Sequence, residues 1–155
     1  MGHSGGPALA DLLYFPDDGV AVAVLLNQQN MFPYLAEGIA DILLPPGTLP
    51  PPIADSDPAL TRRLRAVLAS ASEGKVNADE IAEPARAQLV ATLREQGPIV
   101  VGMLDPIEDL VLVEERREPG RWTRKYRVMF GRSARYWSFD ITPEGKIASL
   151  RPVSE

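Results

Sequence analysis

The sequence predicts an α+β protein in two parts. Two apolar, β-prone segments, residues 12–15 and 20–26, flank the turn signal Pro16-Asp17-Asp18-Gly19. After a proline-rich stretch, segments with helical periodicity precede segments in which polar and apolar residues alternate. This order predicts helices packed on a curved antiparallel sheet of four to five strands. The expected parts are an apolar hairpin with one helix, a linker and an α+β domain, over residues 1–44, 45–56 and 57–155.

The hairpin is unusually apolar for two isolated strands. Residues 20–26 form a continuous apolar run, which is typical of strands buried on both faces. Two strands cannot cover both of their own faces, so the hairpin needs partners. A helix over residues 34–44 is predicted to cover one face through a stripe at helical spacing. Its stripe comprises Leu35, Ile39, Ile42 and Leu43.

The linker and the helices after it are marked by proline, capping residues and glycine. Five prolines between Pro45 and Pro52 predict a stiff, extended segment. Asp57 is the expected N-cap of a helix with Pro58 at its first position, and Gly74 ends that helix. The predicted stripe of this helix is Leu60, Leu64, Val67, Leu68 and Ala71. A short turn over residues 78–81, capped by Asn77, and a helix over residues 84–96, stopped by Gly97, are expected to follow.

The predicted strands occupy the last third of the chain. In the central one, Lys125 and Arg127 share one face, and the other face is formed by Trp122, Tyr126, Val128 and Phe130. Such alternation indicates a sheet with one packed face and one wetter face. The expected strands are residues 99–104, 110–118, 122–130, 136–142 and 146–151.

Composition excludes several classes of site. The chain has no cysteine, which excludes disulfides and thiolate metal sites, and its one histidine, His3, excludes a histidine-rich metal site. No cofactor or metal is expected. No apolar run approaches the roughly 18 residues of a membrane span, and the start lacks the basic flank of a signal peptide. We expect a soluble protein of bacterial type, with a cytoplasmic and a periplasmic location both open.

The charges are unevenly distributed. The net charge is −5, yet no Lys or Arg precedes Arg62. A basic stretch over residues 116–135 is interleaved with aromatic residues, a pattern also found on surfaces that bind single-stranded nucleic acid. Alternation separates most of these charges from the rings. A solvated sheet face is therefore predicted, and no nucleic-acid partner.

The start of the chain carries a motif. Gly2-His3-Ser4-Gly5-Gly6-Pro7 precedes the first hairpin strand, and the second strand ends at Asn27 before the closing helix. This succession resembles the C-terminal part of the β-lactamase-related serine hydrolases, which include class C β-lactamases, D-alanyl-D-alanine peptidases and esterases. The resemblance implies that His3, Ser4 and Gly5 form the family's third motif, on a strand lining the active site. There they would contact a substrate carboxylate or oxyanion.

The other motifs of that family are expected upstream of this segment. The family's nucleophile lies in a Ser-x-x-Lys motif that precedes the third motif. Ser72 and Lys75 have this spacing, but they follow His3 and lie at a predicted helix end. Ala8 is a further departure, since relatives often have glycine there. The sequence thus predicts a C-terminal hydrolase segment without a complete catalytic site, inactive alone.

Residues 57–155 resemble a different fold. Helices, a curved antiparallel sheet and the turn Asp140-Ile141-Thr142-Pro143-Glu144-Gly145-Lys146-Ile147 are similar to the cystatin-like, nuclear-transport-factor-2-like fold. The resemblance implies an accessory domain with a pocket for a small-molecule ligand in the concave face of the sheet. Tyr126, Trp137 and Asp140 are the candidates to line it, with core packing as the alternative role.

Two functional hypotheses remain open at this point. The first is the C-terminal segment of a serine hydrolase, joined to an accessory domain. The second is a stand-alone, non-catalytic binding or oligomerisation module of cystatin-like fold. Either hypothesis predicts that the apolar hairpin finds a partner. The expected arrangement is a homodimer formed through the hairpin, or a hairpin folded onto the second domain.

Overall fold

The computed structural model describes residues 2–5, 9–27, 35–45, 48–102, 107, 109–130 and 133–153. The chain forms two compact units, Met1–Thr48 and Leu49–Glu155, so the boundary falls inside the predicted linker. Each unit contains one antiparallel sheet and at least one helix, which confirms the predicted α+β class.

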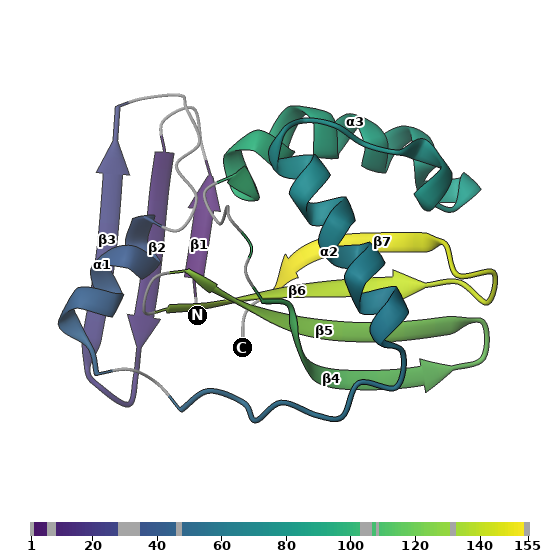
Figure 1. Cartoon of the computed structure of the whole chain (residues 1–155). Helices are drawn as coiled ribbons and strands as arrows, with labels where there is room; N and C mark the ends of the chain where they lie inside the picture. The colour runs from purple at the N-terminus through teal and green to yellow at the C-terminus, as the bar shows by residue number, and fades with distance from the viewer. Residues whose placement is uncertain are drawn as a thin grey trace. The chain divides into compact units, whose positions relative to one another are not determined.

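The first unit is a three-stranded sheet with one helix. Its strands are β1 (Gly2–Gly5), β2 (Leu9–Phe15) and β3 (Val20–Leu26), in the order β1-β2-β3, and its helix is α1 (Leu35–Leu43) (Figure 1). The turn between β2 and β3 ends at Gly19, whose φ of 64° is the left-handed conformation that glycine adopts readily.

Only one face of this sheet is covered. Val22 and Val24 of β3 pack with Ala36 and Ala40 of α1 in a small buried cluster. Burial alternates along β3, so within the described residues the strand is buried on one of its two faces, and burial of the second stays a prediction. The other face stays open because α1 supplies the single covering layer among the described residues. The large apolar side chains exposed there are Leu12, Tyr14 and Leu25, at 49%, 49% and 81%.

The second unit begins with the predicted helical region. It contains α2 (Pro58–Ser72), a 3₁₀ turn η1 (Ala78–Glu80) and α3 (Glu83–Val100). Both predicted caps are confirmed: the Asp57 carboxylate accepts from the Leu60 N–H at 2.9 Å, and Asn77 accepts from Asp79. Burial of Leu60, Leu64, Leu68 and Ala71 confirms four members of the predicted stripe of α2, whereas the fifth, Val67, is half-buried. None of the helices in the described ranges is both long enough and apolar enough to cross a bilayer.

Helix α3 corrects the sequence prediction. Gly97 does not stop the helix, which continues through Pro98 to Val100, so residues 99–100 are helical rather than the start of a strand. Gly97 is needed for contact between helices, since a Cβ there would run into the backbone of Ala71 in α2. Residues 101–102 form a turn, and residues 103–104 of the predicted strand lie outside the described residues.

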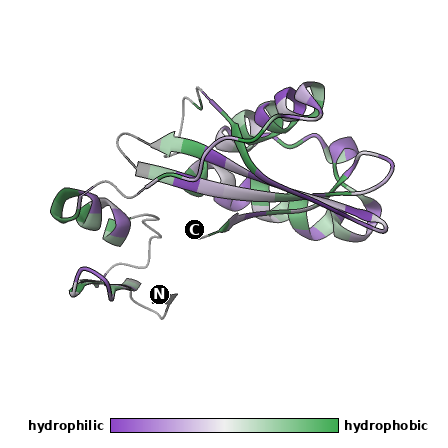
Figure 2. Cartoon of the chain, turned by 90° about the horizontal axis from the view of Figure 1, so that it is seen from below, coloured by the Kyte–Doolittle hydropathy of each residue, from purple (hydrophilic) through white to green (hydrophobic). Residues whose placement is uncertain are grey.

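The sheet of the second unit is a meander of four antiparallel strands. They are β4 (Val111–Glu118), β5 (Arg121–Phe130), β6 (Ser133–Ile141) and β7 (Ile147–Val153), in the order β4-β5-β6-β7. Helix α2 crosses one face of this sheet (Figure 1). The helices of the second unit carry both hydrophobic and hydrophilic residues (Figure 2), as expected for a layer between a sheet and solvent. The core under α2 includes Leu64, Leu68, Tyr126, Phe139 and Ile147.

A β-bulge changes which residues of β4 face the helix. Leu112 pairs with Tyr126 and Glu115 pairs with Arg124, with a register shift between Leu112 and Glu114. The extra residue is Val113. Because of it, Leu112 and Glu115 lie on the same face although they are three positions apart. This places a carboxylate on the helix-covered side of the sheet.

Candidate functional site

The motif residues lie on an edge strand of the first unit. In β1, His3 pairs with Leu12, Ser4 with Asp11 and Gly5 with Ala10. Only the backbone of β1 is within the described part of the structure. The described structure therefore gives the pairing of this strand and leaves the role of His3, Ser4 and Gly5 a prediction.

Ser72 and Lys75 do not form a nucleophile and its base. The Ser72 hydroxyl donates to the Ala69 carbonyl at 2.7 Å within α2. The Lys75 ammonium donates to the Glu73 carboxylate at 2.6 Å, and this hydrogen bond raises the pKa of Lys75. An ammonium held in its charged form is a poor general base.

The three predicted pocket residues do not share a face. Tyr126 and Trp137 are cross-strand partners on the face covered by α2, and both are buried. Asp140 lies on the opposite face of the sheet, where its carboxylate accepts from the Thr123 hydroxyl at 2.6 Å. Tyr126 packs edge-on against Phe139, with ring centres 5.7 Å apart, so it acts as a core residue.

A fully buried arginine lies between α2 and the sheet. Arg124 has no exposed side-chain surface. Its Nη2 contacts the Asp55 carboxylate, with which it forms an ion pair, and lies 3.5 Å from Glu115. Its Nη1 donates to the Asp57 carbonyl at 3.3 Å. Two carboxylates and a backbone carbonyl therefore compensate the removal of this guanidinium from water.

Thr61 connects this arginine to the tyrosine. The Thr61 hydroxyl donates to Asp55 at 2.7 Å and lies 2.9 Å from the Tyr126 hydroxyl. Burial raises the pKa of Tyr126 to about 12, because desolvation disfavours the phenolate. For Asp55, burial acts to raise the pKa, but hydrogen bonds from Thr61 and Arg124 outweigh it and the pKa is lowered. We call Asp55, Thr61, Glu115, Arg124 and Tyr126 the Arg124 network.

Hydrogen bonds within and beside the Arg124 network attach the segment before α2 to the sheet. Ile53 donates its N–H to the Leu112 carbonyl at 3.0 Å, and Arg127 donates to the Pro50 carbonyl at 2.8 Å. The Ser56 hydroxyl donates to Glu115. Residues 49–56 are therefore part of the second unit, which corrects the prediction that the whole of 45–56 is a linker.

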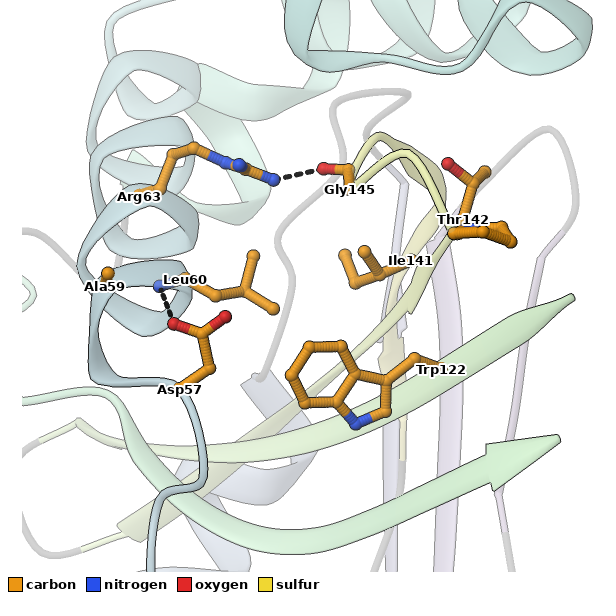
Figure 3. Close-up of a pocket in the computed structure, with 9 residues that line it drawn as sticks. Asp57, Ala59, Leu60, Arg63, Trp122, Ile141, Thr142 and Gly145 are labelled. Atoms are coloured by element: carbon orange, nitrogen blue, oxygen red, sulfur yellow. Dashed lines mark hydrogen bonds between the residues drawn. The ribbon is translucent and has the colours of Figure 1, made fainter.

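A pocket opens beside the network, between the first turns of α2 and the turn that joins β6 to β7. Its volume is about 420 Å³. Arg63 crosses one end, donating to the Gly145 carbonyl and pairing with Glu80 at 3.1 Å (Figure 3). The lining residues are Asp57, Ala59, Leu60, Arg63, Trp122, Ile141, Thr142, Pro143 and Gly145.

Trp122 forms one wall of this pocket and is held by two arginines. The guanidinium carbon of Arg117 lies 4.1 Å from the centre of the indole ring, and that of Arg124 lies 4.7 Å from it. Such stacking fixes the orientation of the ring. Sequence alternation already placed Trp122 and Tyr126 on one face. Arg124 belongs to the same alternation, which was the available signal for its burial.

Comparisons with known proteins identify no relatives. No family model, no curated protein and no solved structure matches the chain. In the described part of the chain, no group of three or more His, Asp or Glu side chains has the geometry to hold a metal ion.

Proposed function

We propose that residues 1–48 are a segment of a β-lactamase-related serine hydrolase domain and that residues 49–155 are an accessory domain joined to it. In this proposal β1 supplies the third motif, and the nucleophile and its base come from outside these 155 residues. The observation that carries the proposal is the order of elements in the first unit. One sheet contains the edge strand with His3-Ser4-Gly5 and the hairpin that follows it, and a helix comes next along the chain.

The open face of the first sheet supports the same proposal. Leu12, Tyr14 and Leu25 leave an apolar surface that one helix cannot cover. In a larger domain, an apolar sheet face of this kind packs against a further layer of helices or strands. We infer that this face is covered by further parts of the hydrolase domain.

The test combines gene sequence and acylation. Upstream coding sequence in the same reading frame is expected to encode a Ser-x-x-Lys motif, and its absence would contradict the proposal. The 155-residue chain alone should not be labelled by a fluorescent penicillin and should not hydrolyse a p-nitrophenyl ester, with a class C β-lactamase as positive control. Turnover that disappears in Ser4→Ala would show that the chain carries its own catalytic site.

A stand-alone oligomerisation module is the second candidate, and the exposed face of β2 and β3 is the observation that favours it. The acidic residues of the first unit give this candidate a distinctive property. They are Asp11, Asp17, Asp18, Glu37 and Asp41, and no Lys or Arg lies in this unit. Two copies paired through these units would bring like charges together, so salt should strengthen the dimer.

Sedimentation equilibrium at low and high salt tests this candidate. For a homodimer, the fraction of dimer should rise between about 20 mM and 500 mM NaCl, over which the Debye length falls several-fold. Leu25→Lys, which puts a charge on the face, should give a monomer. Asp79→Lys, at an exposed position of the second unit, is the matched control and should leave the dimer unchanged.

A further inference from the structure

The pocket between α2 and the β6–β7 turn is lined by both apolar and polar residues, and Asp57 is the one carboxylate among them. Leu60 and Ile141 point toward each other, and the ring of Trp122 lies beside both (Figure 3). Asp57 lies at the start of α2, next to Trp122 in the same view. A volume of about 420 Å³ falls within the range of small-molecule sites.

The arginines around the pocket pair with carboxylates other than Asp57. Arg63 pairs with Glu80, Arg124 pairs with Asp55, and Arg117 lies 3.5 Å from Glu115. For Asp57, no ion pair is present within the described part of the chain. One carboxylate oxygen accepts the Leu60 N–H as the helix cap. Because an ionised carboxylate can accept several hydrogen bonds, the cap leaves capacity for a ligand.

Both recognition groups are held in place by the Arg124 network. The Asp57 N–H donates to Asp55 at 2.9 Å, and the Asp57 carbonyl accepts from Arg124 at 3.3 Å. The same Arg124 stacks on Trp122 at 4.7 Å. Arg124 thus fixes the backbone of Asp57 and the indole ring, while the Leu60 N–H fixes the Asp57 carboxylate. A pair of recognition groups preorganised in this way loses less entropy on binding.

We propose that this pocket binds a small organic cation. Its ammonium group donates to the Asp57 carboxylate, and its apolar group lies against the half-buried ring of Trp122. An anionic ligand would meet the charge of Asp57, and Arg63 already donates to Gly145 and pairs with Glu80. The site consists of second-unit residues alone, so it is independent of the hydrolase proposal.

The probe is 2-phenylethylamine, compared with 2-phenylethanol and phenylacetate. Binding is followed on the full chain through the Trp122 indole N–H in ¹H–¹⁵N spectra, a signal assigned by its loss in Trp122→Phe. The amine should shift this signal saturably. The alcohol and the carboxylate should bind about tenfold more weakly or worse, because neither makes a charge-assisted hydrogen bond to Asp57.

Asp57→Asn is the decisive variant, since asparagine keeps the helix cap and removes the charge. It should weaken amine binding about tenfold or more while the melting temperature stays near that of the wild type. Glu95→Gln, which removes an exposed carboxylate of α3, is the matched control and should bind normally. Equal affinity for amine and alcohol, unchanged binding by Asp57→Asn, or no saturable shift of the Trp122 signal would overturn the proposal.

Discussion

Gly97 of α3 lies against the backbone of Ala71 in α2, so closely that a Cβ on Gly97 would come within 2.9 Å of the Ala71 carbonyl carbon. The two helices can approach this closely because glycine has no side chain. Both residues are buried, which makes the contact part of the core rather than a surface detail.

Gly97→Ala should therefore destabilise the second unit although alanine favours helices. Its better helix propensity contributes about 1 kcal/mol, whereas overpacking costs about 1–3 kcal/mol and requires the backbone of α2 to move. We expect a lower free energy of unfolding by urea denaturation. Gly102→Ala is the control, because its Cβ would meet the Ser72 carbonyl oxygen at an ordinary 3.5 Å. Equal stability of the two variants would contradict the close contact.

Arg124→Met should be strongly destabilising, because it leaves Asp55 and Glu115 without their buried partner. Breaking a buried ion pair on one side costs about 3–5 kcal/mol. A double-mutant cycle with Asp55→Asn should show that the two losses are not additive. Arg121→Met removes an exposed ion pair with Glu118 at 2.8 Å and should cost less than about 1 kcal/mol. A similar cost for both arginines would argue against the network.

Acid should lower the free energy of unfolding of the second unit, because Asp55 becomes protonated. The folded-state pKa of this carboxyl is lowered from its ordinary 3.8, chiefly because hydrogen bonds from Thr61 and Arg124 outweigh burial. The stability that ionised Asp55 contributes is thus present when the pH is above the ordinary pKa. It is lost as the pH falls through the lower pKa of the folded state. Free energies of unfolding measured between pH 6 and about 2 should show this decline. The decline should be smaller in Asp55→Asn; an identical pH profile would count against the assignment.

Tyr126 should lose its proton at a higher pH than an ordinary tyrosine. Burial raises its pKa to about 12, so the folded state favours the neutral phenol. The resulting stability is fully present below the unfolded value near 10 and is lost as the pH rises toward about 12. Absorbance at about 295 nm should show a phenolate signal that forms at a higher pH than for ordinary tyrosines and that is missing in Tyr126→Phe. A complete tyrosine titration near pH 10 in the folded protein would contradict this expectation.

Local signals were enough to predict most elements of the fold. Asp57 with Pro58 marked the start of α2, and alternation marked the strands around Trp122 and Trp137. Gly97 misled the prediction, since a glycine that ends a helix and a glycine that lets two helices touch look alike in sequence. The distinction depends on Ala71, which is distant in the chain.

The candidate site was harder to predict because it depends on contacts across the fold. Asp55 lies in a proline-rich stretch that gave no hint of packing, yet it pairs with Arg124, 69 positions away. Asp57 was recognised as a cap, but its position beside Trp122 required the sheet to be in place. Asp140 was expected to line a pocket with Tyr126 and Trp137, but the pairing of the strands places it on the opposite face.

The bulge at Val113 gives β4 one residue more than its pairing with β5 requires. Removing Val113 would leave Leu112, Glu114 and Glu115 in simple alternation, with Leu112 and Glu115 still opposite Tyr126 and Arg124. Removing Arg116 instead would reverse the orientation of the residues after it and take Arg117 away from Trp122. The strand thus tolerates shortening at its bulge and not beyond it, which makes Val113 the position where homologous chains can differ in length without losing the buried arginine.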